Sequence, residues 1–107
     1  MKTLNLTDLV RFGEEAHVEV LAETGRLFSQ VVCLQESQSF GPAADPTCDA
    51  LVTVLAGEVA AQVGKGRARM KQWEAVVADA GQELSLRNAS EEPAVVLLVL
   101  APPPPAP

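Results

Sequence analysis

Residues 50–88 read ALVTVLAGEVAAQVGKGRARMKQWEAVVADAGQELSLRN, and their pattern decides the fold. Short apolar runs rich in valine and leucine are separated by turns at Gly57, at residues 64–66 and at Gly81. Apolar runs of this length, bounded by glycine turns, are typical of β-strands, and no convincing helical periodicity is present. The segment therefore predicts a series of short strands.

The residues on either side extend this series. Strands are expected at 16–22, 27–36, 51–55, 59–63, 67–73, 73–78, 83–88 and 94–101. Residues 37–49, with two proline-containing turns, are expected to form a polar loop that is long enough to carry function. Many short strands joined by turns predict an all-β sandwich or barrel.

The first expected strand alternates with a period of two, which indicates one buried face. The apolar face is expected to hold Ala16, Val18, Val20 and Ala22. His17 lies on the opposite, polar face beside Glu19. A surface histidine paired with a carboxylate is the favoured interpretation, and a proton-transfer role is the alternative.

The last expected strand, residues 94–101, is apolar throughout. Both of its faces should then be covered, one by the core and the other by a second subunit. A homodimer is the expected assembly. The proline-rich residues 102–107 lack almost all amide donors, so they are expected to form a solvated polyproline II tail after a single domain at 1–101.

Composition excludes several classes of function. The chain has 107 residues and a formal net charge of −6, whereas a nucleic-acid partner requires a basic face. The group of basic residues within 65–71 is expected to be a solvated strand face. No apolar run approaches the roughly 18 residues that cross a bilayer, and the N-terminal residues lack the apolar stretch of a signal peptide. A cytoplasmic protein without a membrane partner is expected, with Cys33 and Cys48 as free thiols.

Taken together, residues 50–59, the 64–66 turn, residues 74–81 and Asn88 resemble a small single-domain cupin, and the resemblance covers roughly residues 27–102. It implies a jelly-roll barrel, the double-stranded β-helix. Metal-binding cupins carry two histidines and a glutamate in a first motif and one histidine in a second. With Gly57 closing the first motif, and Gly81 and Asn88 matching the second, these ligand positions fall on other residue types.

The two histidine positions of the first motif fall on Ala43 or Ala44 and on Asp45 or Pro46. The glutamate position falls on Ala50 and the last histidine position on Leu84. The only histidine in the chain is His17. Since a divalent metal needs several imidazole or carboxylate donors in one place, the sequence predicts no metal and no other cofactor.

Six residues remain as candidates for a ligand pocket: Asp45, Cys48, Ala50, Trp73, Leu84 and Asn88. Cys48 is interpreted as a buried thiol rather than a nucleophile, because it lacks a base and has carboxylates nearby. Trp73 replaces a family glycine; plugging the barrel or packing in an interface is favoured over stacking on a ligand. Asn88 is either a polar anchor for a ligand or an amide satisfied by loop backbone. Cys33 is expected to be core packing.

No catalytic constellation is evident. The favoured function is a metal-free domain that binds a small molecule or regulates. The alternatives are a small cupin enzyme, such as an isomerase or a dioxygenase-like relative with non-standard ligands, and a structural partner subunit. A lumen filled with side chains would favour the last of these.

Overall fold

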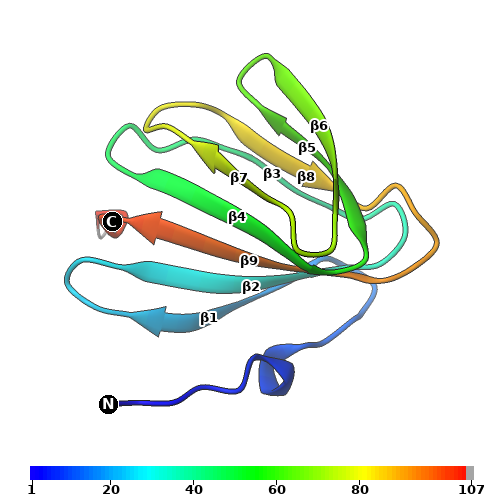
Figure 1. Ribbon diagram of the computed structural model, residues 1–107, viewed down its shortest axis with the longest axis horizontal. Helices are drawn as coiled ribbons and strands as arrows, with labels where there is room; N and C mark the ends of the chain where they lie inside the picture. The colour runs from blue at the N-terminus through cyan, green and yellow to red at the C-terminus, as the bar shows by residue number, and fades with distance from the viewer. Residues whose placement is uncertain (106–107) are drawn as a thin grey trace.

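The computed structural model describes residues 1–105 and folds them into two antiparallel sheets that face each other (Figure 1). The strands are β1 (His17–Glu23), β2 (Phe28–Leu34), β3 (Ser39–Ala43), β4 (Asp49–Ala56), β5 (Glu58–Val63), β6 (Gly66–Lys71), β7 (Ala75–Ala78), β8 (Leu84–Arg87) and β9 (Ala94–Ala101). One sheet has the order β1-β2-β9-β4-β7 and the other has the order β3-β8-β5-β6. The all-β jelly roll expected from the sequence is confirmed.

The core lies between the two sheets. Its buried side chains alternate along β2, β4 and β9 on one side and along β5 and β8 on the other, as a period of two requires. Its fully or almost fully buried members include Val32, Leu34, Val52, Val54, Val59, Leu86, Val96 and Leu98. The predicted common face of Leu84, Leu86 and Asn88 is confirmed, since all three are buried.

The expected buried face of β1 is wrong in part, because Ala16 packs against the core but the two valines of this face do not become buried. Val18 and Val20 are 38% and 49% exposed, whereas His17, Glu19 and Leu21 are half-buried. Val18 pairs with Val32 and therefore points to the side of the core, but β1 is the edge strand. The smaller opposing sheet leaves this edge uncovered, and alternation alone carries no information about how far a facing sheet extends.

The predicted 37–49 loop is also wrong in part, because it contains β3. This strand pairs with β8 through Ser39–Arg87, Phe40–Leu86 and Ala43–Leu84, with an irregularity between Phe40 and Ala43. Gly41 has a φ of 89°, and a Cβ at this position would lie 2.5 Å from the Leu84 carbonyl oxygen. The glycine that made the segment resemble a loop is what allows the irregular strand to approach β8.

The outer face of the five-stranded sheet is partly covered by the N-terminal segment. A short 3₁₀ helix, η1 (Leu6–Leu9), places Leu6, Leu9 and Val10 against Val31, Cys33 and Val95. Farther along the same face, Leu51 and Val77 are exposed. The second face of β9 is thus covered in part from within the chain, and an apolar patch remains beside it.

The expected solvated tail is only partly solvated, since Pro102 is exposed but the next two prolines are not. Pro103 and Pro104 are half-buried, and Pro105 is exposed. Residues 106–107 of the expected tail lie outside the described residues. Within residues 1–105, no helix is long and apolar enough to span a membrane.

Candidate ligand cavity

A cavity of about 400 Å³ opens between the two sheets. It lies at the end of the barrel where β4 and β8 begin and β7 and β9 end, and these strand ends can be followed in Figure 1. It is lined by Phe28, Gln30, Phe40, Ala43, Ala44, Asp45, Cys48, Ala50, Ala78, Asp79, Gln82, Leu84, Leu98, Leu100 and Pro104. Its inner wall is apolar, and its polar groups come chiefly from the two loops at its mouth, residues 44–48 and 79–83. The volume falls in the lower part of the range typical of small-molecule sites.

Four of the six sequence-predicted pocket residues meet in this cavity: Asp45, Cys48, Ala50 and Leu84. Ala50 pairs with Ala78 of β7 and with Leu100 of β9, so three strands contribute neighbouring positions to one wall. Leu84 opposes them from β8, next to Ala43 of β3. The positions to which the sequence resemblance assigned the family's metal ligands therefore line one hollow.

The two mouth loops are fixed to each other by backbone hydrogen bonds. The Gly81 N–H donates to the Asp45 carbonyl oxygen at 2.9 Å, and the Ala80 N–H donates to Asp49 Oδ1 at 2.9 Å. In the second loop the Asp79 N–H donates to Gln82 Oε1 at 2.9 Å. These contacts hold Asp45 and Asp79 in place on the same rim.

The Asp45 side chain is organised by Thr47. The Thr47 hydroxyl and the Thr47 N–H both donate to Asp45 Oδ1, at 2.5 Å and 2.7 Å. The hydroxyl bond, the amide bond and a weaker contribution from Cys48 lower the pKa of Asp45 below its usual value. The carboxylate at the mouth is therefore held in its charged form, and Oδ2 is not engaged by Thr47.

The residues at the family's metal-ligand positions do not fit a metal. Ala43, Ala50 and Leu84 have no donor atoms, and Asp45 alone supplies oxygen. Within residues 1–105, no group of three or more histidine, cysteine or acidic side chains is placed to hold an ion. Since transition metals in proteins require several converging donors, no step of a metal-dependent reaction can be assigned to these side chains.

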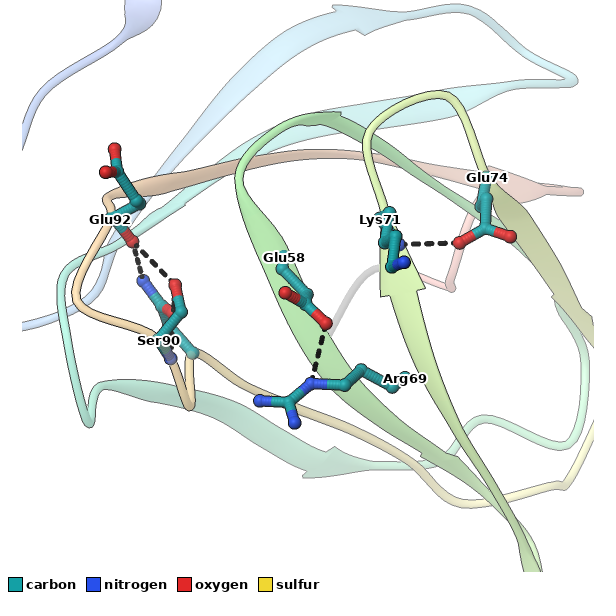
Figure 2. A network of polar contacts seen from close by, with 7 residues as sticks. Glu58, Arg69, Lys71, Glu74, Ser90 and Glu92 are labelled. Carbon is teal, nitrogen blue, oxygen red and sulfur yellow. Dashed lines mark hydrogen bonds and ion pairs between the residues drawn. The ribbon is translucent and has the colours of Figure 1, made fainter.

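Trp73 lies outside the cavity. It is 74% exposed in the turn between β6 and β7, with a φ of 73°, so it does not plug the barrel. The backbone N–H of Trp73 donates to the Val54 carbonyl oxygen at 2.8 Å. Across the same turn, the backbone N–H of Lys71 donates to Glu74 Oε1 at 2.7 Å (Figure 2). The interpretation that Trp73 plugs the barrel is therefore wrong, and packing in an interface stays a prediction.

Asn88 also lies outside the cavity and is fully buried. Its amide nitrogen donates to the carbonyl oxygens of Leu34, at 3.0 Å, and Glu92, at 2.7 Å. Its Oδ1 accepts hydrogen bonds from the N–H and hydroxyl of Ser90. The amide is satisfied by backbone groups of the 88–93 loop together with the Leu34 carbonyl oxygen at the end of β2, which agrees with the second of the two interpretations offered by the sequence.

Both cysteines are free thiols, but their surroundings differ. Cys48 is buried at the mouth, with its sulfur 3.6 Å from the Thr47 hydroxyl. Cys33 is buried on the far side of the sheet, where burial raises the pKa of its thiol. The expectation that Cys33 packs in an apolar cluster is confirmed.

His17 is remote from the cavity and lies on the outer face of β1 opposite Cys33. Its Nε2 is 4.0 Å from Glu19 Oε2, and neither atom has a hydrogen-bond partner within the described residues. The predicted pairing of the histidine with Glu19 is present. Their surroundings are less polar than expected because this face packs under the N-terminal segment.

The basic residues of β6 form a solvated face, as expected. Arg67 and Arg69 are exposed on this strand, and Arg69 Nε lies 2.7 Å from Glu58 Oε1 of β5 (Figure 2). Together with Arg87 they border a shallow hollow on the outer face of the four-stranded sheet. The charged side chains that line the cavity between the sheets, Asp45 and Asp79, are instead acidic.

Several cavity residues were not predicted as site residues. Phe28 and Gln30 alternate with the core residues Val32 and Leu34 along β2, so their inward direction could have been inferred from the sequence. Pro104 and Phe40 could not, because their placement depends on a tail that folds back and on a strand hidden in an expected loop. Asp79 was expected to be solvated; it is exposed and also lines the mouth.

Comparison with solved structures supports the fold. A protein from Thermus thermophilus superimposes with a TM-score of 0.91 at 28% identity, over 97% of this chain and 100% of that one. An uncharacterised Klebsiella pneumoniae protein with a double-stranded β-helix domain gives 0.88 at 24% identity, over 95% and 90%. KdgF from Halomonas sp. gives 0.82 at 14% identity, over 96% and 94%. No curated protein matches the sequence.

The match to a sequence family covers most of the same barrel. Residues 30–100 match the family model described as the cupin domain, and this segment runs from within β2 to within β9. It contains eight of the nine strands in whole or in part and most of the cavity wall. The chain therefore belongs to the cupin family.

Proposed function

We propose that this cupin domain binds a small, largely apolar molecule in the cavity between its sheets and does so without a metal ion. The observation that carries the proposal is the cavity itself, which is open and lined by the residues at the family's ligand positions. A lumen filled with side chains would instead have supported a purely structural subunit.

The lining supports binding more strongly than catalysis. Phe28, Phe40, Leu84, Leu98 and Leu100 provide apolar surface, and each square ångström that a ligand covers contributes roughly 25 cal/mol. No histidine lines the cavity, and its single thiol, Cys48, has no basic neighbour among the lining residues. The side chains present can enclose and orient a ligand, but they include no pair of nucleophile and base.

The proposal is tested by calorimetric titration with 2-phenylethanol as a probe of the cavity. We expect saturable binding with one site per chain. Ala43→Phe should abolish it, because Ala43 is an exposed residue on the cavity wall and a phenyl ring there fills the mouth. Ala60→Phe is the matched control. Ala60 is also an exposed strand alanine, but it lines the shallow hollow on the outer face of the four-stranded sheet and not the cavity.

Saturable binding that survives Ala43→Phe would place the probe elsewhere and contradict the proposal. Absence of binding to the unmodified protein would contradict it as well. The circular dichroism spectrum and melting temperature of Ala43→Phe should match those of Ala60→Phe, which separates a blocked cavity from a misfolded chain.

A further inference from the structure

The cavity has a charge of one sign. Asp45 and Asp79 line its mouth, and none of its lining residues is lysine, arginine or histidine. The remaining polar side chains, Gln30 and Gln82, are neutral amides. An anionic ligand would meet two carboxylates and no counter-charge, whereas a cation would be attracted by both.

The Asp45 carboxylate is held by hydrogen bonds, and the backbone of the loop that carries Asp79 is tied to the Asp45 loop. Asp45 is held through Oδ1 by Thr47, and its loop is joined to the Asp79 loop by the 2.9 Å hydrogen bond from the Gly81 N–H. A preorganised charge loses less entropy when a ligand binds than a mobile one does. Thr47 engages only Oδ1, so the carboxylate keeps acceptor capacity on Oδ2 for a ligand at the mouth, beside its weaker contact with Cys48.

The wall behind the carboxylates is apolar and includes two aromatic rings. Phe28 comes from the start of β2 and Phe40 from β3, so the rings belong to opposite sheets. Aromatic faces attract cations in addition to covering apolar surface. The cavity thus combines an apolar interior with a negatively charged rim.

We propose that the ligand is an amine, with an apolar or aromatic body inside the cavity and a protonated nitrogen at the mouth beside Asp45 and Asp79. This inference rests on the proposed function and adds the chemical class of the ligand. An alkylamine is protonated at neutral pH, as the lysine side chain is, and its three donors suit carboxylate acceptors.

The test compares three probes of similar size by calorimetry at pH 7: 2-phenylethylamine, 2-phenylethanol and 3-phenylpropanoate. The amine should bind about three- to tenfold more tightly than the alcohol, the range expected for a charge-assisted contact at a partly solvated site. The carboxylate should bind more weakly than the alcohol. Raising the salt concentration should narrow the difference between amine and alcohol.

Variants locate the effect. The double change Asp45→Asn and Asp79→Asn should bring the affinity for the amine down to that for the alcohol, while the unchanged alcohol affinity shows that the cavity is intact. Glu91→Gln removes a charge from an exposed loop residue that does not line the cavity, so it should preserve the preference for the amine. It therefore controls for general attraction of a cation to an acidic protein.

The outcomes separate the two claims. Equal affinities for amine and alcohol, or tightest binding of the carboxylate, would overturn the amine inference and leave cavity binding standing. A preference for the amine that persists in the double variant would overturn the roles given to Asp45 and Asp79. Failure of all three probes to bind would overturn the proposed function and this inference with it.

Discussion

Replacing Asn88 by alanine should be among the most damaging single changes outside the apolar core. The side chain is fully buried and takes part in four hydrogen bonds that connect the end of β2 with the loop between β8 and β9. The backbone groups of Asn88 pair separately with Ser37 and Gln38, so the substitution removes the side-chain bonds alone.

The magnitude follows from the partners that are left behind. The Leu34 residue is fully buried, so its carbonyl oxygen loses a partner that water cannot easily replace, whereas Ser90 and Glu92 are reachable by solvent. At roughly 1 kcal/mol for each bond, less for the groups that regain water, the free energy of unfolding should fall by about 3 kcal/mol. For a domain of this size that corresponds to a drop of about 10–20 °C in melting temperature.

Urea denaturation followed by far-ultraviolet circular dichroism measures this change. Asn5→Ala is the matched control, because Asn5 also accepts hydrogen bonds from its neighbour Thr7 but is exposed at the start of η1. Its loss should cost about 1 kcal/mol or less. A cost below about 1 kcal/mol for Asn88→Ala would refute the view that buried backbone partners make this amide structural.

Three further predictions concern the cavity, the sheet face and the tail. A quadruple variant that restores the family's donor types should bind cobalt or zinc. Binding is measured by cobalt absorption and by a metal-dependent rise in melting temperature. A folded variant without a metal response would show that the alignment of this chain to the family's ligand positions is wrong. Its changes are Ala43→His, Asp45→His, Ala50→Glu and Leu84→His, and Leu84→His alone should bind no metal and lower stability by roughly 1 kcal/mol or more. Light scattering should give a mass twice that of the 11.3 kDa chain, as expected for a homodimer. Val77→Lys, on the exposed apolar face, should shift the protein towards monomer. A monomeric unmodified protein would contradict the predicted homodimer. Deleting residues 102–107 should leave the melting temperature within a few degrees and speed labelling of Cys48, but not of Cys33, by a thiol reagent. An unchanged labelling rate would mean that Pro104 does not shield Cys48 at the mouth.

The sequence predicted the strands that obey simple rules. The run from Ala94 to Ala101 became β9 with those bounds, and the glycines at 64 and 66 ended β5 and started β6. These elements depend on local pattern, where the period of two and the turn residues are sufficient. The cavity positions Ala50 and Leu84 came instead from the resemblance to cupins, by counting along the family's two motifs from Gly57 and from Gly81.

Features that depend on distant parts of the chain were not predicted. The exposure of Val18 and Val20 reflects how far the opposing sheet extends, and β3 depends on pairing with β8 rather than on its own composition. The position of Pro104 on the cavity lining depends on a tail whose direction no local pattern indicates. Trp73 gave a misleading signal because a large aromatic side chain usually packs, whereas this one occupies a solvent-exposed turn with positive φ.

Binding of 2-phenylethanol before and after treatment with a chelator tests the central claim most directly. The side chains at the cavity supply too few donors for a metal, so a ligand must be held by the apolar wall and the polar rim alone. The account predicts the same affinity in ethylenediaminetetraacetate, and no further change when zinc, iron or manganese is added. Binding that disappears with the chelator and returns with one of these metals would contradict it.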